Sequence, residues 1–425
     1  MKTSSAVIAV TSQLKPVLLK IFPKELLSRL KRKYMNQDIK KLLKYEKKAF
    51  DGTKNPCGIN LIANIKADTG LGESSRIVAA DLQSADIPFV IYNFALPGQD
   101  GGKNEKFQDQ IVDRLCYAVN MIHINPNEMA TSLKEIGFDK LDYRYNIGFW
   151  SWELEDFPKE WQGCIDVLDE IWTPSEFASN SIRKRTDKKV RTLPHFVSAE
   201  ADATYDRAYF GLPEDKFLFL IVYDSGSVAE RKNPQAAINA YKEAFGNDTD
   251  EVGLVIKVSH ASKEELQELQ ESLQSVKNVY FIAESLKKIE INSLIKNVDV
   301  YVSLHRAEGF GLVLAEAMQL QTAVIATGWS GNMEFMDENV ACLVDYKLIP
   351  VATEQGGFSQ KSVWADADVG QAAEYMKKLW KDPAYYRSLC EKAKEHIENN
   401  NNPKKISELA KSYYEEILAE KGYKK

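Results

Sequence analysis

The stretch DVYVSLHRAEGFGLVLAEAMQLQTAVIAT, residues 299–327, decides the fold class. Its apolar run at 299–304 predicts a buried strand, and Gly309 and Gly311 predict a turn. The segment 311–320 then has helical character, and TAVIAT at 322–327 predicts a second strand. A strand, a helix and a second strand in such close succession form a crossover unit, which needs a parallel sheet. The sequence therefore predicts an α/β domain.

The same alternation extends outward from this unit in both directions. Each apolar run is nearly continuous, as expected of strands buried on both faces. The further predicted strands are 57–65, 87–94, 118–125, 145–152, 170–175, 217–224, 252–258, 279–285 and 341–346. Helical patterns, such as 234–245, separate many of them. We predict two Rossmann-like, doubly wound domains that face each other across a cleft, and a cleft is where such folds place a ligand.

A polar stretch after residue 197, ending near Pro213, predicts the boundary between the two domains. We assign residues 51–208 to an N-terminal domain and residues 209–385 to a C-terminal domain. Residues 1–50 form a basic helical arm, and residues 386–425 form C-terminal helices.

Composition excludes several classes of protein. The chain has 425 residues, of which 44% are hydrophobic and 27% charged, as in ordinary globular proteins. The net charge of −6 has the wrong sign for a chain that holds nucleic acid. Five scattered cysteines without a C-x-x-C pair predict neither a zinc site nor a disulfide framework, and favour a cytoplasmic protein.

The first fifty residues carry thirteen Lys or Arg against three acidic residues, a net +10, so the rest carries −16. Within them, LKPVLLKIFPKELLSRLKRKY at 14–34 places leucines at helical spacing with cations between them. Two interpretations stay open: a short helix lying peripherally on an anionic membrane, or a helix hairpin packed on its own protein with a solvated basic face. No segment reaches the roughly 18 apolar residues that a membrane crossing needs.

The turn in 305–318 also carries chemistry. Glycines between a strand and a helix let a phosphate approach backbone N–H groups, and the helix dipole favours an anion there. Glu308 and Glu316, eight residues apart, flank this turn and can accept hydrogen bonds from sugar hydroxyls. The structural alternative is that Glu308 merely stabilises the first turn and Glu316 the helix surface.

With the strand before it and TAVIATGWSGNMEFM after it, this turn resembles the donor site of retaining glycosyltransferases of family 4, with its E-x7-E motif and GT-B fold. The resemblance covers about residues 58–385. It implies that Glu308 contacts the donor sugar and that Glu316 holds the ribose. It also implies that a C-terminal helix returns to the first domain. Backbone groups expected at the donor are those of Phe310, Gly311, Leu312, Gly331 and Asn332.

Cations must neutralise the departing diphosphate. In YDSGSVAERKNPQAA, residues 223–237, Lys232 matches the family's lysine, whereas the expected arginine position falls near Gly226. Arg231 is the candidate substitute, and Lys257 is a further candidate. The structural alternative is that this segment simply begins a helix.

The first domain offers four further candidates. Gly70 and Gly72 lie at a strand-to-helix turn, where open amides would approach the nucleotide. Asn125 ends a predicted strand, at the position where many relatives have histidine. Glu153 lies among tryptophans in FWSWELEDFPKEW, residues 149–161, and could line a sugar pocket. Turn formation and core packing are the corresponding structural explanations, and we interpret His123 as a core residue.

No Asp-x-Asp pair follows a strand in a position to hold a metal, so we expect neither a metal nor another cofactor. The resemblance implies transfer of a hexose from a nucleotide sugar to a glycan acceptor. If the basic arm binds a membrane, we expect a lipid-linked glycan acceptor at the cytoplasmic membrane face, in polysaccharide assembly. UDP, GDP and dTDP donors are equally compatible. Two alternatives are a nucleotide-sugar epimerase of the same architecture and a non-catalytic partner subunit, the latter favoured by the missing arginine.

Overall fold

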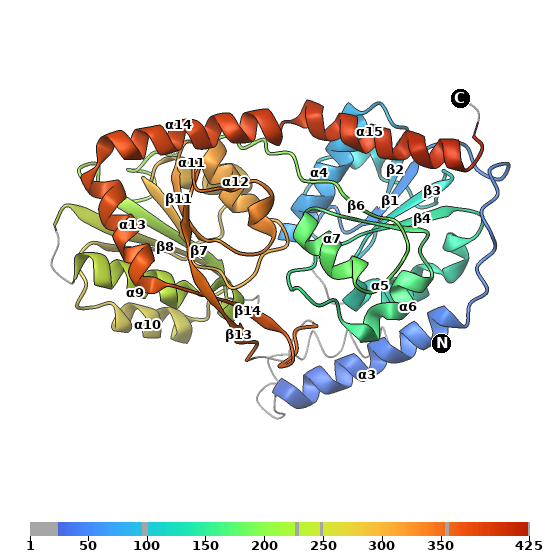
Figure 1. Cartoon of the computed structure of the whole chain (residues 1–425), viewed down its shortest axis with the longest axis horizontal. Coiled ribbons are helices and arrows are strands. Elements are labelled where there is room, and N and C mark those ends of the chain that lie inside the picture. The colour runs from blue at the N-terminus through green and yellow to red at the C-terminus, as the bar shows by residue number, and fades with distance from the viewer. Residues whose placement is uncertain (1–23, 96–100, 226–228, 247–249, 353–356, 424–425) are drawn as a thin grey trace. The chain divides into compact units, whose positions relative to one another are not determined.

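The computed structural model describes residues 24–95, 101–225, 229–246, 250–352 and 357–423. The chain divides into two compact units, each described here by itself (Figure 1). Unit 1 comprises residues 1–196, 351–362 and 403–425, and unit 2 comprises residues 197–350 and 363–402. The domain limits assigned from the sequence stay predictions.

Unit 1 is built on a parallel six-stranded sheet in the order β2-β1-β3-β4-β5-β6. Every residue of β1, β3, β4 and β5 is buried, which fits a sheet covered on both faces. The sequence predicted the first five strands, whereas the three-residue β6 was too short to stand out. The bounds are β1 (Ile59–Ala63), β2 (Phe89–Asn93), β3 (Val119–His123), β4 (Tyr145–Phe149), β5 (Glu170–Thr173) and β6 (Val190–Thr192).

Helices cover this sheet. Thr69 caps α4, because its side chain accepts a hydrogen bond from the Gly72 N–H, and Pro126 opens α5. The helices are α3 (Lys24–Leu43), α4 (Gly70–Ser84), α5 (Pro126–Ile136), α6 (Gln162–Asp166), α7 (Glu176–Arg183) and α15 (Pro403–Glu420), with short 3-10 turns η1 (Gln108–Gln110), η2 (Phe138–Leu141) and η3 (Lys159–Trp161).

Three buried asparagines fix the register of the central strands of unit 1. Asn60, Asn120 and Asn146 lie opposite one another on β1, β3 and β4. The amide of Asn60 donates to Asn120 at 3.0 Å, and that of Asn120 donates to Asn146 at 2.8 Å. A shift of one strand by one residue would break this ladder inside the core, where an unpaired amide is costly.

Unit 2 contains a second parallel six-stranded sheet, in the order β12-β11-β10-β7-β8-β9. Its strands are β7 (Phe217–Asp224), β8 (Val252–Ser259), β9 (Val279–Ile282), β10 (Val300–Ser303), β11 (Ala323–Thr327) and β12 (Cys342–Val344). Its helices are α8 (Ala229–Lys232), α9 (Pro234–Phe245), α10 (Lys263–Ser272), α11 (Lys288–Lys296), α12 (Leu312–Gln319), α13 (Val369–Lys381) and α14 (Pro383–Asn400), with the 3-10 turn η4 (Gly331–Glu334). The predicted pair of doubly wound sheets is confirmed.

One element of unit 2 was not predicted. Strands β13 (Tyr346–Pro350) and β14 (Val363–Ala367) form an antiparallel hairpin separate from the main sheet. Asp366 lies in β14, and the side chain of Asp368 caps α13. The residues between the two strands, 351–362, belong to unit 1.

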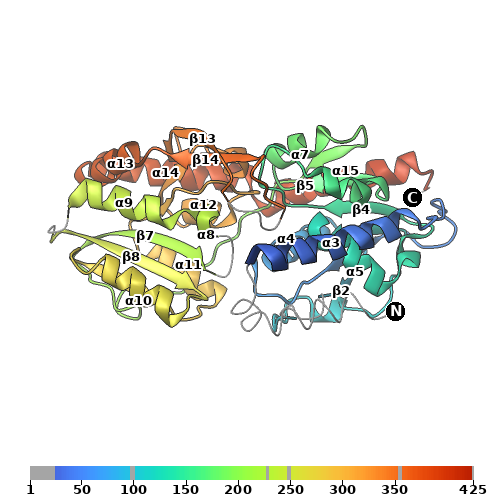
Figure 2. The same cartoon turned by 90° about the horizontal axis from the view of Figure 1, so that it is seen from below.

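The basic arm is described only from residue 24 onward. Helix α3 packs on α5 and α6 (Figure 2). Asp38, Ile39 and Leu42 are buried there, and Asp38 forms an ion pair with Lys134 at 3.1 Å. The second half of the helix therefore packs on its own protein, as one of the two interpretations held, while residues 1–23 lie outside the described part. Among the described residues, no helix is both long and apolar enough to cross a membrane.

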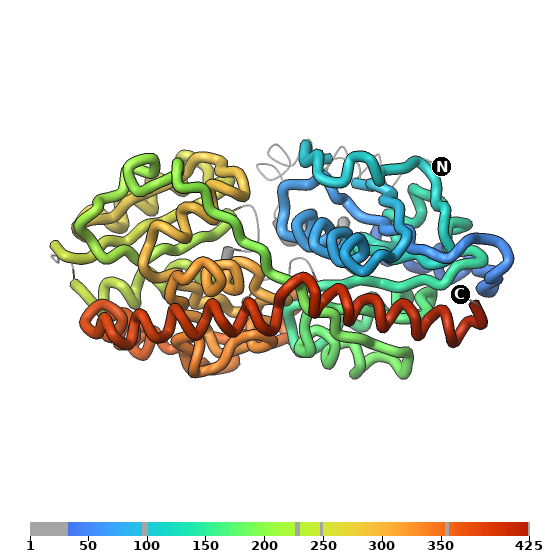
Figure 3. The backbone as a smooth tube through the Cα atoms, turned by 90° about the horizontal axis from the view of Figure 1, so that it is seen from above, coloured from blue at the N-terminus to red at the C-terminus, as the bar shows by residue number. Residues whose placement is uncertain are grey.

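The end of the chain returns to unit 1, as expected. Helices α13 and α14 belong to unit 2, whereas α15 belongs to unit 1 and runs beside α4 (Figure 3). The side chain of Arg191 ties α15 to the sheet through Glu416 at 2.7 Å and the face of Tyr413 at 4.5 Å. Arg191 also pairs at 2.6 Å with the fully buried Glu170. These contacts of Arg191 hold α15 against the sheet.

Candidate functional site

The best-defined site of unit 2 is the loop between β10 and α12. Gly311 precedes the helix with φ of +91°, a conformation that favours glycine. A Cβ atom at Gly331 would come within 2.3 Å of Gly309, so the loop that follows β11 lies directly against this turn. Glycines therefore allow two loops to meet at the start of α12.

Glu308 lies at the centre of this loop and is mostly buried. Its carboxylate accepts a hydrogen bond from Lys232 at 2.5 Å and forms an ion pair with Arg231 at 3.2 Å. The Arg231 guanidinium also donates to the Ala307 carbonyl at 2.9 Å. Two cations from α8 thus meet one carboxylate from the loop after β10.

This arrangement fixes the charge of Glu308. Burial by itself raises the pKa of its carboxyl group, but Lys232, Arg231 and His305 more than offset that effect and lower the pKa to about 2. Glu308 is therefore a carboxylate at any physiological pH. Such a group accepts hydrogen bonds from hydroxyls but has no proton to donate.

Glu316 lies on α12 and is buried, and it pairs with Lys288 at the start of α11. Tyr301 on β10 is buried. Burial and the charges of Glu308 and Glu316 all raise the pKa of its hydroxyl. The two glutamates that the sequence singled out therefore both act on one buried tyrosine.

A second network holds the loop after β11. The Asn332 amide donates to the Thr327 carbonyl at 3.0 Å, so its Oδ1 accepts from His305 Nε2 at 3.0 Å. The Thr327 hydroxyl donates back to the His305 carbonyl at 2.7 Å. Asn332, which the sequence placed at the donor for its backbone, thus acts here through its side chain.

The other predicted residues of unit 2 are more dispersed. Phe310 is buried against Phe335, with ring centroids 4.9 Å apart, and Leu312 is the first residue of α12. Lys257 is fully buried at the end of β8, where its ammonium group donates to the Val258 carbonyl and the Ser259 hydroxyl. Burial lowers the pKa of Lys257. The structure gives Lys257 no contact with Glu308.

In unit 1, the predicted glycine turn opens α4. A Cβ atom at Gly72 would lie 2.1 Å from the Ala67 carbonyl oxygen, whereas one at Gly70 would meet nothing within 4 Å. Buried Arg76 donates to the carbonyls of Ile65 and Ala67 at 2.7 and 2.9 Å. The turn is therefore rigid, and Gly72 is the glycine that it requires.

Asn125 lies between β3 and α5, and its side chain contacts the loop after β4. Its side chain accepts from the Ser151 N–H at 3.1 Å and donates to the Ser151 carbonyl at 3.4 Å. Glu153 follows in the same loop and is half-buried. The structure thus brings the segments that carry these two candidates together.

His123 is a buried core residue, as its interpretation had it. It stacks on Phe149 and shares the Ser74 hydroxyl with His195, at 2.8 and 2.9 Å respectively. Burial lowers the pKa of His123 to about 4 and that of His195 to about 3, so both imidazoles are neutral.

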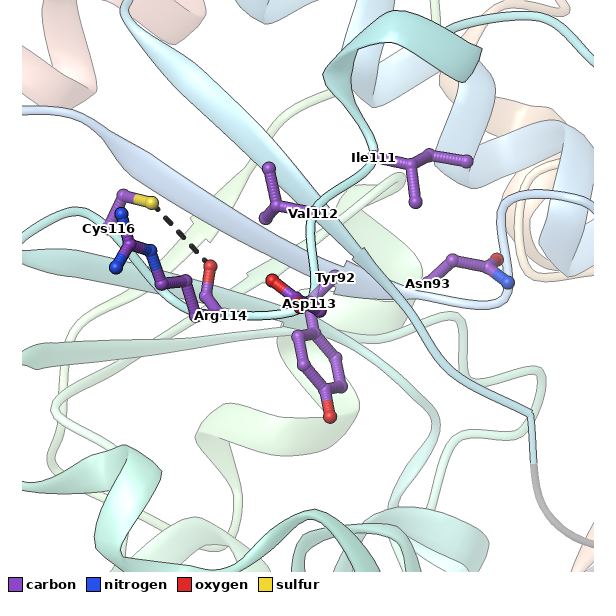
Figure 4. A pocket seen from close by; sticks show the side chains of 7 residues that line it. All are labelled: Tyr92, Asn93, Ile111, Val112, Asp113, Arg114 and Cys116. Carbon is purple, nitrogen blue, oxygen red and sulfur yellow. Dashed lines mark hydrogen bonds between the residues drawn. The ribbon is translucent and has the colours of Figure 1, made fainter.

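An open cavity of about 710 Å³ lies at the edge of unit 1, beside β2 (Figure 4). None of the sequence-predicted site residues lines it. Its lining residues are Tyr92, Asn93, Ile111, Val112, Asp113, Arg114 and Cys116. We place the candidate site at Glu308, because charge and burial converge there.

Two contacts of the site escaped the sequence. Lys288 reaches Glu316 across 28 positions, and Ser330 accepts a hydrogen bond from the Glu308 N–H at 2.9 Å. Ser330 was quoted from the sequence only as part of the segment TAVIATGWSGNMEFM, residues 322–336. No group of three or more potential metal ligands occurs among the residues described.

The two sheets and their order define the GT-B class of protein, and solved structures share this fold. HepE of Anabaena, in complex with UDP and glucose, has a TM-score of 0.60 at 12% identity over 85% of this chain and 100% of its own. Sucrose-phosphate synthase of Thermosynechococcus elongatus has a TM-score of 0.62 at 15% identity over 86% and 100%. The pneumococcal O-GlcNAc transferase GtfA, with UDP and GlcNAc, has 0.51 at 16% identity over 71% and 57%. The chain thus spans just over half the length of the pneumococcal enzyme, and at these identities the likeness shows the fold alone.

A family model matches most of the second unit in sequence. Residues 204–402, a little under half of the chain, match the sequence model of the family described as Glycosyl transferases group 1. This range contains Arg231, Lys232, Glu308 and Glu316. A comparison with curated proteins gives no significant match. The matched part of the chain is therefore similar in sequence to group 1 glycosyltransferases, and the solved structures add the shared fold.

Proposed function

We propose that the protein is a retaining, metal-independent glycosyltransferase of family 4 that moves a hexose from a nucleotide sugar to a glycan or lipid-linked glycan acceptor. The observation that carries this proposal is the group of Glu308, Lys232 and Arg231 at the start of α12. A carboxylate next to two cations provides an acceptor for sugar hydroxyls and positive charge for a diphosphate at the same place.

In this mechanism the diphosphate lies against Lys232, Arg231 and the N-terminal amides of α12. Its negative charge grows as the glycosidic bond breaks, and the cations stabilise that charge in the transition state. Glu308 orients the hexose through its hydroxyls, and Glu316 binds the ribose diol. The acceptor hydroxyl attacks from the face that the nucleotide leaves, and the leaving phosphate takes its proton. The protein contributes positioning and charge.

Thermal-shift measurements with UDP, GDP, dTDP and ADP sugars test donor binding, because a ligand that binds only the folded state raises Tm. UDP sugars come first, since solved structures of this fold hold UDP. We expect the best donor to be hydrolysed slowly without an acceptor. Lys232→Ala and Glu308→Ala should each lower that rate at least a hundredfold, while Lys263→Ala, at an exposed position on α10, should not.

The alternatives give different results in the same assay. An epimerase would convert the nucleotide sugar into its epimer without releasing nucleotide. A non-catalytic partner subunit would bind a donor and turn nothing over. EDTA should leave the rate unchanged, and a rate restored only by Mg²⁺ or Mn²⁺ would contradict metal independence. Retention would be read from the anomeric configuration of the product.

We further propose that the N-terminal arm attaches the enzyme peripherally to the cytoplasmic face of the membrane, as polysaccharide assembly would require. Its support is the charge of residues 1–50 and the leucine pattern of 14–34. Deletion of residues 1–50 would remove buried Ile39 and Leu42, so the sharper variant replaces Arg29, Lys31 and Arg32 by glutamine. We expect this variant to lose sedimentation with phosphatidylglycerol vesicles and keep its Tm. Equal sedimentation of both proteins would refute the attachment.

A further inference from the structure

Ser330 has a backbone conformation that side chains rarely adopt. Its φ of +81° and ψ of −148° lie in a region that is essentially reserved for glycine. Ser330 is also buried, so contact with water does not stabilise this conformation. Backbone strain of this kind persists only where the surrounding structure holds it, and it concentrates at functional sites.

The strained residue is attached to Glu308 from both sides. The Glu308 N–H donates to the Ser330 hydroxyl at 2.9 Å, and the Gly331 N–H donates to the Glu308 carbonyl at 2.9 Å. Ser330 and Gly331 thus hold both backbone groups of the residue whose carboxylate meets Lys232 and Arg231. Glycine at position 330 would relieve the strain but could not accept the first of these bonds.

We propose that Ser330 is a positioning residue that fixes the orientation of Glu308 toward the donor sugar, and that the strain at its backbone is the cost of supplying this hydroxyl. The inference rests on the proposed function, in which Glu308 contacts the hexose. It predicts that removal of the hydroxyl affects recognition of the sugar and leaves recognition of the nucleotide intact. Ser330 itself does not touch the substrate.

Two substitutions separate the hydroxyl from the strain. Ser330→Gly removes both, and Ser330→Ala removes the hydroxyl and keeps the strain. We expect Ser330→Gly to unfold at a Tm equal to or above that of the wild type, and Ser330→Ala to unfold below Ser330→Gly. Gln321→Gly is the matched control, because Gln321 also has a positive φ, of +62°, but lies at the far end of α12 from Glu308.

Binding is measured by calorimetry with UDP-glucose and with UDP. We expect the wild type to bind UDP-glucose more tightly than UDP. In both Ser330 variants the Kd for UDP-glucose should rise about tenfold, while the Kd for UDP stays the same. Gln321→Gly should keep the difference. A Ser330→Gly variant that discriminates between UDP-glucose and UDP like the wild type would overturn the proposal.

Hydrogen exchange provides a readout without a ligand. The peptide spanning residues 304–312 should exchange faster in both Ser330 variants and at the wild-type rate in Gln321→Gly. Unchanged exchange in Ser330→Gly would also overturn the positioning role. If the wild type binds no nucleotide sugar of the panel, the proposed function fails, and with it the contact to the hexose, whereas the exchange data still decide whether Ser330 holds Glu308.

Discussion

At the scale of the residue, the site is defined by one carboxylate and its two cations. Glu308 comes from the loop after β10, whereas Lys232 and Arg231 come from α8, and the two cations override the effect of burial on the pKa of Glu308. Since Glu308 has a pKa near 2, it does not titrate in the range where enzymes work. Any pH dependence of the activity between pH 5 and 8 must arise from another group.

Glu308→Gln should lower the stability at pH 7 by roughly 2–3 kcal/mol, because it leaves two cations without their anion. A lowered pKa in the folded state stabilises above the unfolded value of about 4.3 and loses that contribution as the pH falls toward about 2. Urea unfolding of both proteins at pH 7 and at pH 4 measures this. The difference in the free energy of unfolding between the two proteins should be smaller at pH 4 than at pH 7. A larger difference at pH 4 would contradict the assigned charges.

The turn before α4 gives a second prediction at this scale. Gly72→Ala should cost about 1–3 kcal/mol, because the new methyl group would collide with the rigid Ala67 carbonyl. Gly70→Ala, two residues earlier, has open space and should change stability by less than about 1 kcal/mol. Thermal unfolding of both variants checks this. Equal Tm values for the two variants would show that the backbone of the turn shifts to accommodate the methyl group, against the prediction.

At the scale of the element, α4 carries a buried carboxyl group, that of Asp81. Asp81 is almost fully buried, and within the described part of the chain neither carboxylate oxygen has a hydrogen-bond partner. Burial raises the pKa of Asp81 well above its ordinary value. Its contribution to stability is therefore present at low pH and lost as the pH rises from about 4 through the raised pKa.

Asp81→Asn should consequently be more stable than the wild type at pH 8, by about 1–3 kcal/mol, and of similar stability at pH 4. Chemical denaturation at the two pH values measures the difference. Asp86→Asn, at an exposed position just after the helix, should have no such effect. A gain that is equal at both pH values would argue against a titrating Asp81.

The elements differ in how far the sequence could predict them. Continuous apolar runs such as 217–224 and 252–258 predicted buried parallel strands, and the structure has β7 and β8 at these positions. The hairpin of β13 and β14 was missed, because β13 is largely exposed and its partner lies beyond an intervening segment. Local patterns therefore predicted the sheets but not an element defined by pairing at a distance.

The same reason limits the prediction of the site. The spacing of Glu308 and Glu316, and Lys232 before a helix, were readable from the sequence, and the structure brings Lys232 to Glu308. The contact of Lys288 with Glu316 could not be predicted from the sequence, because only folding brings α11 next to α12. The role of Ser330 could not be predicted either, because the order of residues does not show that this serine has a positive φ. The roles assigned to these residues stay predictions until tested.

At the scale of the whole molecule, α15 completes unit 1. Its inner face buries Ile406, Ala410, Tyr414 and Ile417, and Tyr413 packs edge-on against Trp172. Deletion of residues 403–425 should therefore destabilise unit 1 by more than about 5 kcal/mol, while unit 2 keeps its own core. Hydrogen exchange by peptide can separate the two. Loss of protection on β1 and β5, with β7 and β8 unchanged, is expected, and equal loss in both units would contradict it.

The order in which the chain is made gives the division of the units a further consequence. Unit 1 is assembled from three segments, the last of which is α15, and all of unit 2 lies between the first and the last. On the ribosome, unit 2 can be finished while unit 1 still awaits its final helix. All six strands of the unit 1 sheet lie in the first segment, so this sheet must stay soluble without α15 during that interval, and chaperones would meet it there.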